Sequence, residues 1–223
     1  MSTAPDPPHT AKMPAMIYGT AWKKDRTADL VYQAIQAGFR GIDTAHMKQH
    51  YDEAGTGAGI QRAIRDGLVT RQDLWIQTKY TPHDEPYASS PTTPTITSQV
   101  LASVAASLRN LFPDSPPDQE EPYLDALIMH SPFPHPHQTL EAYAALLPLV
   151  PHPLRALGMS NVTLPTLRLL STSPHPPAVV QNRLRAAERA WDVDVRRWCR
   201  AGGLEIRLHL WLFVFVGNIT NSS

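Results

Sequence analysis

Four side chains with acid–base chemistry lie at or just beyond the ends of successive apolar runs: Asp43, Tyr51, Lys79 and His130. A phenol has a pKa of about 10 and is therefore a poor acid near neutrality. An ammonium near Tyr51 would lower that pKa toward the working range, and Lys79 can supply it. Asp43 can pair with Lys79, which would be costly to bury alone. The set suits proton transfer to a carbonyl oxygen that His130 orients.

Such a proton transfer is coupled to hydride transfer, and no protein side chain can donate a hydride. The residues therefore imply a nicotinamide cofactor and a small-molecule carbonyl substrate. Two later apolar runs also end in polar residues, Ser160 with Asn161 and then Gln181. Function in parallel-sheet proteins lies at the carboxyl ends of the strands, so all these residues are candidates for one site.

Each of these residues has an ordinary structural interpretation when it is taken alone. The aspartate suits a turn or a cap, the tyrosine a half-buried packing position, and the lysine a solvated charge. The histidine suits a loop, the Ser-Asn pair a helix-entry turn, and the glutamine a polar strand end. Only the ordered set favours chemistry over these alternatives.

The elements that must position the set alternate along the chain. Short apolar runs predict strands at 15–19, 41–43, 74–79, 124–130, 155–160, 178–181 and, less clearly, 204–210. Between these strands, apolar residues at helical spacing predict helices. The apolar faces run from Leu30 to Ile35 with Thr27 as N-cap, from Val100 to Leu111 with Leu101 included, from Leu140 to Leu147, from a helix start at Thr163, and from Val195 to Cys199. This alternation predicts an α/β fold with a parallel sheet. Six units and a seventh strand fit a doubly wound sheet or an incomplete (β/α)₈ barrel.

Composition narrows the range of functions. With 223 residues and 42% hydrophobic residues, the chain can bury a sizeable core. Lys plus Arg equals Asp plus Glu at 20 each, so the chain has no excess of positive charge that would favour nucleic-acid binding. The single cysteine, Cys199, and the absence of an apolar N-terminal h-region favour a cytoplasmic protein. The apolar segment 208–216 is too short to span a bilayer, so we expect no membrane partner.

Two local patterns suggest other sites. In "AGTGAG" (54–59) the glycines do not have the G-x-G-x-x-G spacing of a dinucleotide-binding loop, so we expect close helix packing instead. In "HSPFPHPH" the histidines at 130, 135 and 137 are separated by prolines and joined by no cysteine or acid. We therefore expect no metal site there.

The runs "GIDTA", "HYDEAG", "IQTK", "IMHSP", "GMSN" and "VVQN" follow one another in this order, with "YGTAWKK" before them. This ordered set resembles the aldo-keto reductase family over about residues 15–205, especially its fungal members. The resemblance implies an NADPH-dependent carbonyl reductase on a (β/α)₈ barrel. It implies Tyr51 as general acid, with Lys79 lowering its pKa and Asp43 paired with Lys79. It implies His130 as the residue that orients the substrate carbonyl.

The resemblance also implies the residues around the cofactor. Contacts to the nicotinamide carboxamide are matched by Ser160, Asn161 and Gln181. Three earlier positions fall where the family lines the cofactor and the substrate mouth: Gly19 and Thr20 toward the cofactor, Trp22 toward the substrate.

After "WCRAGGLE" the sequence departs from the family, which continues into an aromatic-ended seventh strand, an eighth strand and a lysine-containing loop for the 2′-phosphate. This chain continues as "IRLHLWLFVFVGNITNSS". We therefore expect a flexible tail (1–14), a truncated barrel (15–206) and a divergent apolar tail (207–223). We expect a monomer with weak cofactor binding and aggregation-prone open strand edges. An inactive remnant or a non-enzymatic binding protein is the alternative.

Overall fold

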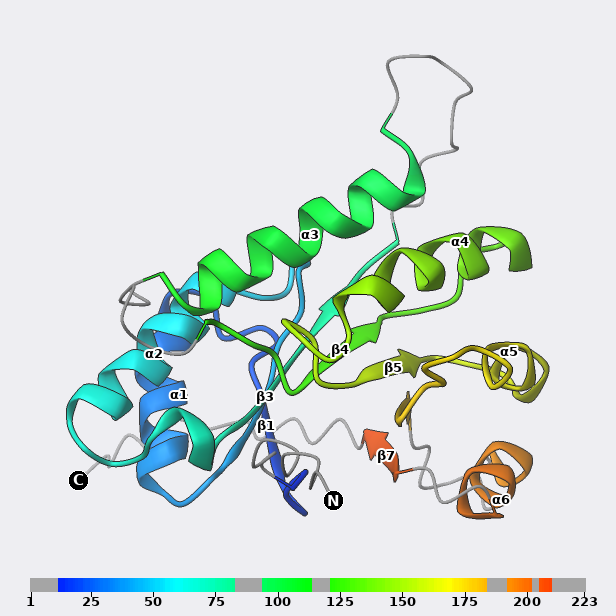
Figure 1. Cartoon of the computed structure of the whole chain (residues 1–223). Coiled ribbons are helices and arrows are strands. Elements are labelled where there is room, and N and C mark those ends of the chain that lie inside the picture. The colour runs from blue at the N-terminus through cyan, green and yellow to red at the C-terminus, as the bar shows by residue number, and fades with distance from the viewer. Residues whose placement is uncertain (1–11, 83–93, 114–120, 184–191, 202–204, 210–223) are drawn as a thin grey trace, which may run out of the picture.

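The computed structural model describes residues 12–82, 94–113, 121–183, 192–201 and 205–209. One parallel sheet holds strands in the sequential order β1 to β7 (Figure 1). The strands are β1 (Ile17–Gly19), β2 (Gly41–Asp43), β3 (Trp75–Tyr80), β4 (Ala126–Met129), β5 (Leu157–Ser160), β6 (Val179–Arg183) and β7 (Glu205–His209). All seven expected strands are confirmed, with ends that differ by a residue or two. The segment 210–223, most of the expected apolar tail, lies outside the described residues.

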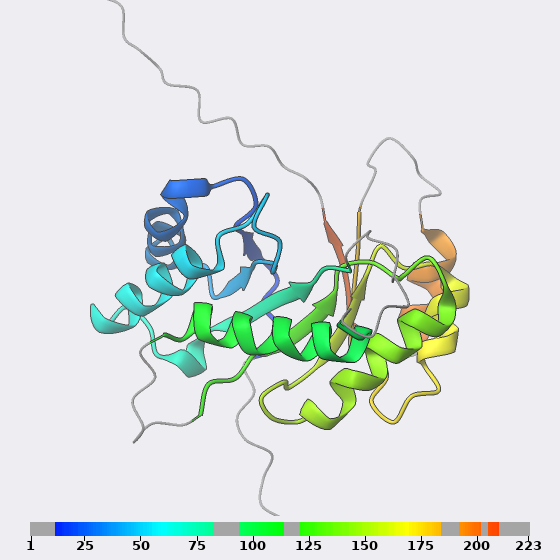
Figure 2. The same ribbon diagram turned by 90° about the horizontal axis from the view of Figure 1, so that it is seen from above.

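Sequential strand order identifies the architecture as an incomplete (β/α)₈ barrel. A doubly wound sheet reverses its strand order at a switch point, and this sheet does not, so that alternative is wrong. Within the described residues β1 pairs with β2 alone and β7 with β6 alone, which leaves the sheet open between them (Figure 2). In the register of β7, Glu205 lies opposite Val179, so this strand pairs with the strand that contains "AVVQ".

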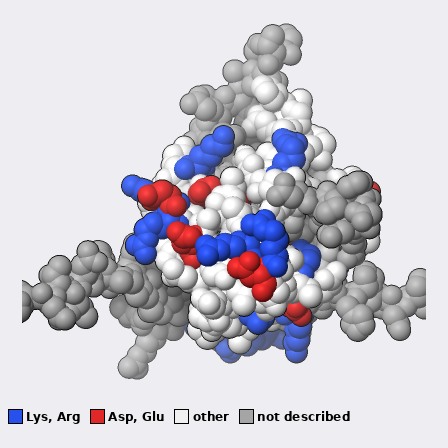
Figure 3. All heavy atoms as spheres, turned by 90° about the vertical axis from the view of Figure 1, so that its left-hand side faces the viewer, with Lys and Arg blue, Asp and Glu red and all other residues white. Residues whose placement is uncertain are grey.

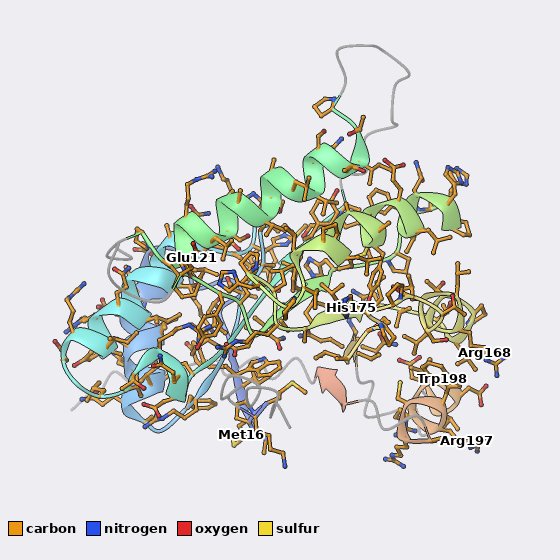
Figure 4. The ribbon with its side chains drawn as sticks, viewed as in Figure 1. Met16, Glu121, Arg168, His175, Arg197 and Trp198 are labelled. Atoms are coloured by element: carbon orange, nitrogen blue, oxygen red, sulfur yellow. The ribbon has the colours of Figure 1, made fainter. Side chains whose placement is uncertain are left out.

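The helices pack on the outer face of the sheet (Figure 2). They are α1 (Thr27–Gln36), α2 (Glu53–Arg65), α3 (Ile96–Leu111), α4 (Pro136–Leu146), α5 (Leu164–Leu170) and α6 (Val193–Ala201), with short 3₁₀ turns at Lys24–Arg26, Arg71–Asp73 and Leu147–Leu149. A single large apolar cluster fills the space between sheet and helices. The Tyr143 hydroxyl on α4 donates to the carbonyl of His175, which ties this layer to the loop after α5. His175 is labelled in Figure 4.

Two details of the expected helices are wrong. Thr27 is the first residue of α1 and not its N-cap, because its hydroxyl donates backward to the Lys24 carbonyl at 2.6 Å. Leu101 and Leu140 were expected on packed faces but are each 40% exposed. On α3 the buried face contains Val100, and a residue one position later lies about 100° around the helix.

The glycines of "AGTGAG" lie inside α2, where they permit close helix packing as expected. A Cβ on Gly57 would lie 2.8 Å from the Leu111 Cα, and one on Gly59 would lie 2.9 Å from the Val31 Cβ. Side chains at these positions would therefore separate α2 from α3 and α1. The outer surface of this region carries acidic and basic side chains interspersed (Figure 3). Arg62 of α2 and Asp29 of α1 form an exposed ion pair.

Strand residues alternate between the helix-covered face and the inner face of the sheet. On β3, Ile76 and Tyr80 join the large outer core, whereas Trp75 belongs to a second apolar cluster on the inner face. Met13 is 7% exposed in that inner cluster, two residues before the boundary expected at residue 15. Residues 1–11 of the expected tail lie outside the described residues, and the division into three segments stays a prediction.

Among the described residues, no helix combines the length and the apolar character needed to cross a membrane.

Candidate active site

The carboxyl ends of the strands surround a cavity of about 90 Å³. Its lining residues are Asp43, Tyr51, Lys79, His130, Ser160, Asn161, Gln181 and Arg183. All four residues proposed for proton transfer line it, together with the three proposed to contact the carboxamide. Arg183 is an addition that the sequence did not indicate.

A buried ion pair forms the floor of this cavity. Lys79, the penultimate residue of β3, places its Nζ 2.5 Å from Asp43 Oδ1 and 2.9 Å from the Thr44 carbonyl. Both side chains are only 3% exposed. The register explains the pairing, because Asp43, the last residue of β2, lies opposite Gln77, and Lys79 follows two residues later on the same inner face of β3. A buried pair of this kind offsets much of the cost of desolvating each charge.

Tyr51 reaches the cavity from the loop between β2 and α2, where its backbone N–H donates to the Met47 carbonyl. The Lys79 Nζ lies 5.5 Å from the centroid of its ring, and the His130 ring meets it edge-on at 6.3 Å. Burial raises the pKa of the Tyr51 phenol, and the negative charge of Asp43 raises it further. In this structure burial and Asp43 outweigh any lowering of the pKa by Lys79, whose ammonium is paired with Asp43, and the role of Lys79 stays a prediction.

His130 directly follows β4 and is fixed at both its backbone and its ring. Its N–H donates to the Tyr80 carbonyl at 2.8 Å, and its Nδ1 lies 2.9 Å from the Thr81 hydroxyl. Its own carbonyl accepts a hydrogen bond from the Asn161 side chain at 2.8 Å. The imidazole is thus held in one orientation at the cavity wall.

Of the three amide and hydroxyl residues, Ser160 ends β5, Asn161 follows it and Gln181 lies within β6. The Ser160 hydroxyl donates to the Gln181 carbonyl at 2.6 Å, which ties the ends of these strands together. Asn161 has a φ of +50°, a left-handed conformation that asparagine tolerates better than most residues. That turn directs its Nδ2 to the His130 carbonyl. Gln181 is 2% exposed and donates to Asp43 Oδ2 at 3.4 Å.

The residues proposed from "YGTAW" are not among those that line the cavity. Gly19 lies opposite Asp43 in the sheet. Thr20 is fully buried and donates to the Asp43 carbonyl from both its N–H, at 2.9 Å, and its hydroxyl, at 3.2 Å. Trp22 is 50% exposed, and its ring lies 4.0 Å from that of His50. Thr20 therefore holds the backbone of Asp43 in place through its carbonyl, and Trp22 lies beside the loop that carries Tyr51.

Sequence reasoning missed three residues of this region. Gln77 and Arg183 lie two residues from Lys79 and Gln181 on the same strands, so strand alternation alone could have found them. Glu53, at the start of α2, is 5% exposed. Burial alone would raise the pKa of Glu53, but hydrogen bonds from His46, Thr78, Ser107 and Asn110 hold it below its usual range. This carboxylate anchors the helix that follows Tyr51.

Sequential parallel strands with a polar cavity at their carboxyl ends are typical of a (β/α)₈ barrel, which is incomplete here, and barrel proteins carry their active sites at that end of the strands. A sequence profile of the aldo/keto reductase family matches residues 15–211. The chain belongs to the aldo/keto reductase family, as the ordered motifs predicted.

Individual relatives match shorter stretches. An NAD(P)H-dependent D-xylose reductase of Pachysolen tannophilus is 47% identical over 68 residues, which are 30% of this chain and 20% of the relative. An aldo-keto reductase of Bombyx mori is 36% identical over 118 residues, 52% of this chain and 32% of the relative. The crystal structure of a Bombyx mori aldo-keto reductase in complex with NADP has a TM-score of 0.69 at 26% identity, covering 88% of this chain and 62% of that one. The chain spans less than two thirds of the length of these relatives.

Proposed function

We propose that the chain is an NADPH-dependent oxidoreductase that reduces aldehydes or ketones to alcohols. The observation that carries this proposal is the convergence of Asp43, Tyr51, Lys79 and His130, from three strand ends and one loop, on a single cavity. Family membership and the NADP complex of the Bombyx mori relative support the choice of cofactor.

Tyr51 is the general acid in this proposal. The phenol carries its proton near neutrality and can give it to a carbonyl oxygen, but because burial and Asp43 raise its pKa, the transfer needs a charge that stabilises the phenolate. Lys79 then stabilises the phenolate that forms, since its Nζ lies 5.5 Å from the Tyr51 ring. His130 orients the carbonyl oxygen from the wall of the cavity.

The cofactor, when bound, supplies the hydride. Its carboxamide would be held by Ser160, Asn161 and Gln181, which offer the hydroxyl and amide groups that pair with an amide. The fit is supported by Asn161, whose Nδ2 is engaged by the His130 carbonyl and the Ser160 hydroxyl. Within the described residues no donor reaches its Oδ1, which can therefore accept an N–H of the carboxamide.

The proposal is tested with the purified full chain by two measurements. Fluorescence titration should show NADPH binding, and NADPH oxidation should depend on an added carbonyl compound, with D-xylose and a simple aromatic aldehyde as first substrates. An absence of NADPH binding at millimolar concentration would contradict the proposal and favour a non-catalytic protein. The monomeric state, the cytoplasmic location and the weak cofactor binding expected from the sequence stay predictions.

A further inference from the structure

Gln77 occupies the middle of β3, on the inner face of the sheet, between the inner apolar cluster and the cavity. It is 1% exposed and does not line the cavity itself. A glutamine amide carries two donors and one acceptor oxygen, so burial is costly unless these groups find partners. Its surroundings satisfy them with polar side chains from three different strands.

The orientation of the Gln77 amide follows from the chemistry of one neighbour. The Trp75 indole N–H lies 2.9 Å from Gln77 Oε1, and an indole nitrogen can only donate. The amide oxygen must therefore face Trp75, and the amide nitrogen must face the carboxyl end of the strands.

That nitrogen contacts two residues of the candidate active site. Gln77 Nε2 donates to Asp43 Oδ1 at 2.8 Å and to Gln181 Oε1 at 3.2 Å. Gln181 Nε2 in turn lies 3.4 Å from Asp43 Oδ2. The three side chains form a closed triangle, and Asp43 Oδ1 also accepts the Lys79 ammonium.

We propose that Gln77 is a positioning residue that fixes Asp43 and Gln181 together. It thereby links the placement of the nicotinamide carboxamide to the groups that transfer the proton. The proposal rests on the proposed function. Without Gln77, the Gln181 amide could turn over and present its N–H groups where its oxygen now lies, and Asp43 would lose a donor opposite Lys79.

The deciding experiment is a double-mutant cycle on NADPH affinity in the full chain. Gln77→Met keeps the length of the side chain and removes its donors. We expect it to weaken NADPH binding about five- to tenfold, the effect of roughly one hydrogen bond, and to lower kcat by a similar factor. In a Gln181→Ala background the same substitution should leave NADPH affinity unchanged, because it acts on the carboxamide through Gln181.

Two further variants separate positioning from packing. Trp75→Phe removes the donor that orients the Gln77 amide together with part of a buried ring, and should weaken NADPH binding in the same direction by a smaller factor. Ile128→Val, in the same inner cluster, changes packing without touching the polar triangle and should leave the affinity unchanged. Thermal unfolding of each variant shows that it is folded and gives the cost of the packing change.

The outcomes are distinct. If the parent binds NADPH and Gln77→Met binds it equally well, the inference is wrong and the proposed function stands. If Gln77→Met weakens binding equally with and without Gln181, its role is general packing and the inference is again wrong. If the parent does not bind NADPH, the proposed function fails first and the inference falls with it.

Discussion

The two ends of the sheet each carry a buried carboxylate paired with basic side chains, but they are built differently. At the carboxyl end Asp43 meets Lys79 beside a cavity. At the amino end Asp125 meets Arg71 at 2.8 Å and Arg155 at 3.4 Å. The two guanidinium carbons lie 3.8 Å and 3.4 Å from the centre of the Tyr123 ring.

The choice of base separates the two clusters by function. A guanidinium stays protonated in proteins and pairs rigidly with a carboxylate, whereas an ammonium is a compact charge whose pKa responds to its surroundings. Arg71 also bonds backbone and carboxylate at once, since it donates to the Leu74 and Tyr123 carbonyls and to Asp125. We infer that the amino-end cluster stabilises the sheet and that the carboxyl-end cluster serves chemistry.

The largest expected effect is the loss of the proton donor at the carboxyl end. Tyr51→Phe should reduce the rate of carbonyl reduction by about 10²–10⁴-fold, because general acid catalysis contributes that much. The ring remains to fill its site, so the free energy of unfolding should change little. Steady-state NADPH oxidation and urea denaturation measure the two quantities. A variant that retains most of the parental rate would identify another residue as the acid.

Lys79→Met should affect both activity and stability. It removes the charge that supports the phenolate and leaves Asp43 buried with an uncompensated charge, at a cost of about 3–5 kcal/mol of stability. Combining it with Asp43→Asn should restore much of the stability without restoring the rate. If the double variant were as unstable as the single one, the lost stability would come from packing and not from charge.

At the amino end, Asp125→Asn should cost stability alone. The carboxylate accepts two guanidinium groups and the Ile76 N–H, and hydrogen bonds to charged groups contribute about 1.5–3 kcal/mol each. Activity per folded molecule should be unchanged. Asp29→Asn is the matched control, because its pair with Arg62 is exposed and should contribute less than about 1 kcal/mol. A folded Asp125→Asn variant with impaired turnover would show that the two ends are coupled.

The smallest expected effect is that of pH on reduction. Because the pKa of Tyr51 is raised, its phenol should stay protonated from about pH 7 to about pH 9, and the rate of reduction should not fall. Alcohol oxidation needs the phenolate, whose fraction rises about tenfold per pH unit below the pKa, so it should accelerate with pH. A reduction rate that declines across this range would mean that Lys79 lowers the Tyr51 pKa in the working protein.

The sequence predicted the seven strands and the seven cavity residues of the ordered motifs because both depend on local patterns, whereas the barrel architecture was implied by the family resemblance. Short apolar runs mark strands, and polar residues at their ends share an edge. Gln77 was not predicted as a site residue, because a glutamine inside a strand looks like an ordinary polar residue until its three partners are known. The apolar pattern of α2 was weak because glycines form much of its packed face. The raised pKa of Tyr51 depends on burial, which no single motif reveals.

The bond from Gln181 to Asp43 joins residues 138 positions apart in the chain. Contacts of such long range require the intervening chain to be closed first, and they are therefore slow to form during folding. Strand pairing between neighbours can begin near the N-terminus, but the polar triangle of Asp43, Gln77 and Gln181 cannot form before β6 has joined the sheet. We therefore expect the site to mature late, so that partly folded chains hold Asp43 and Lys79 before they gain the geometry to use them.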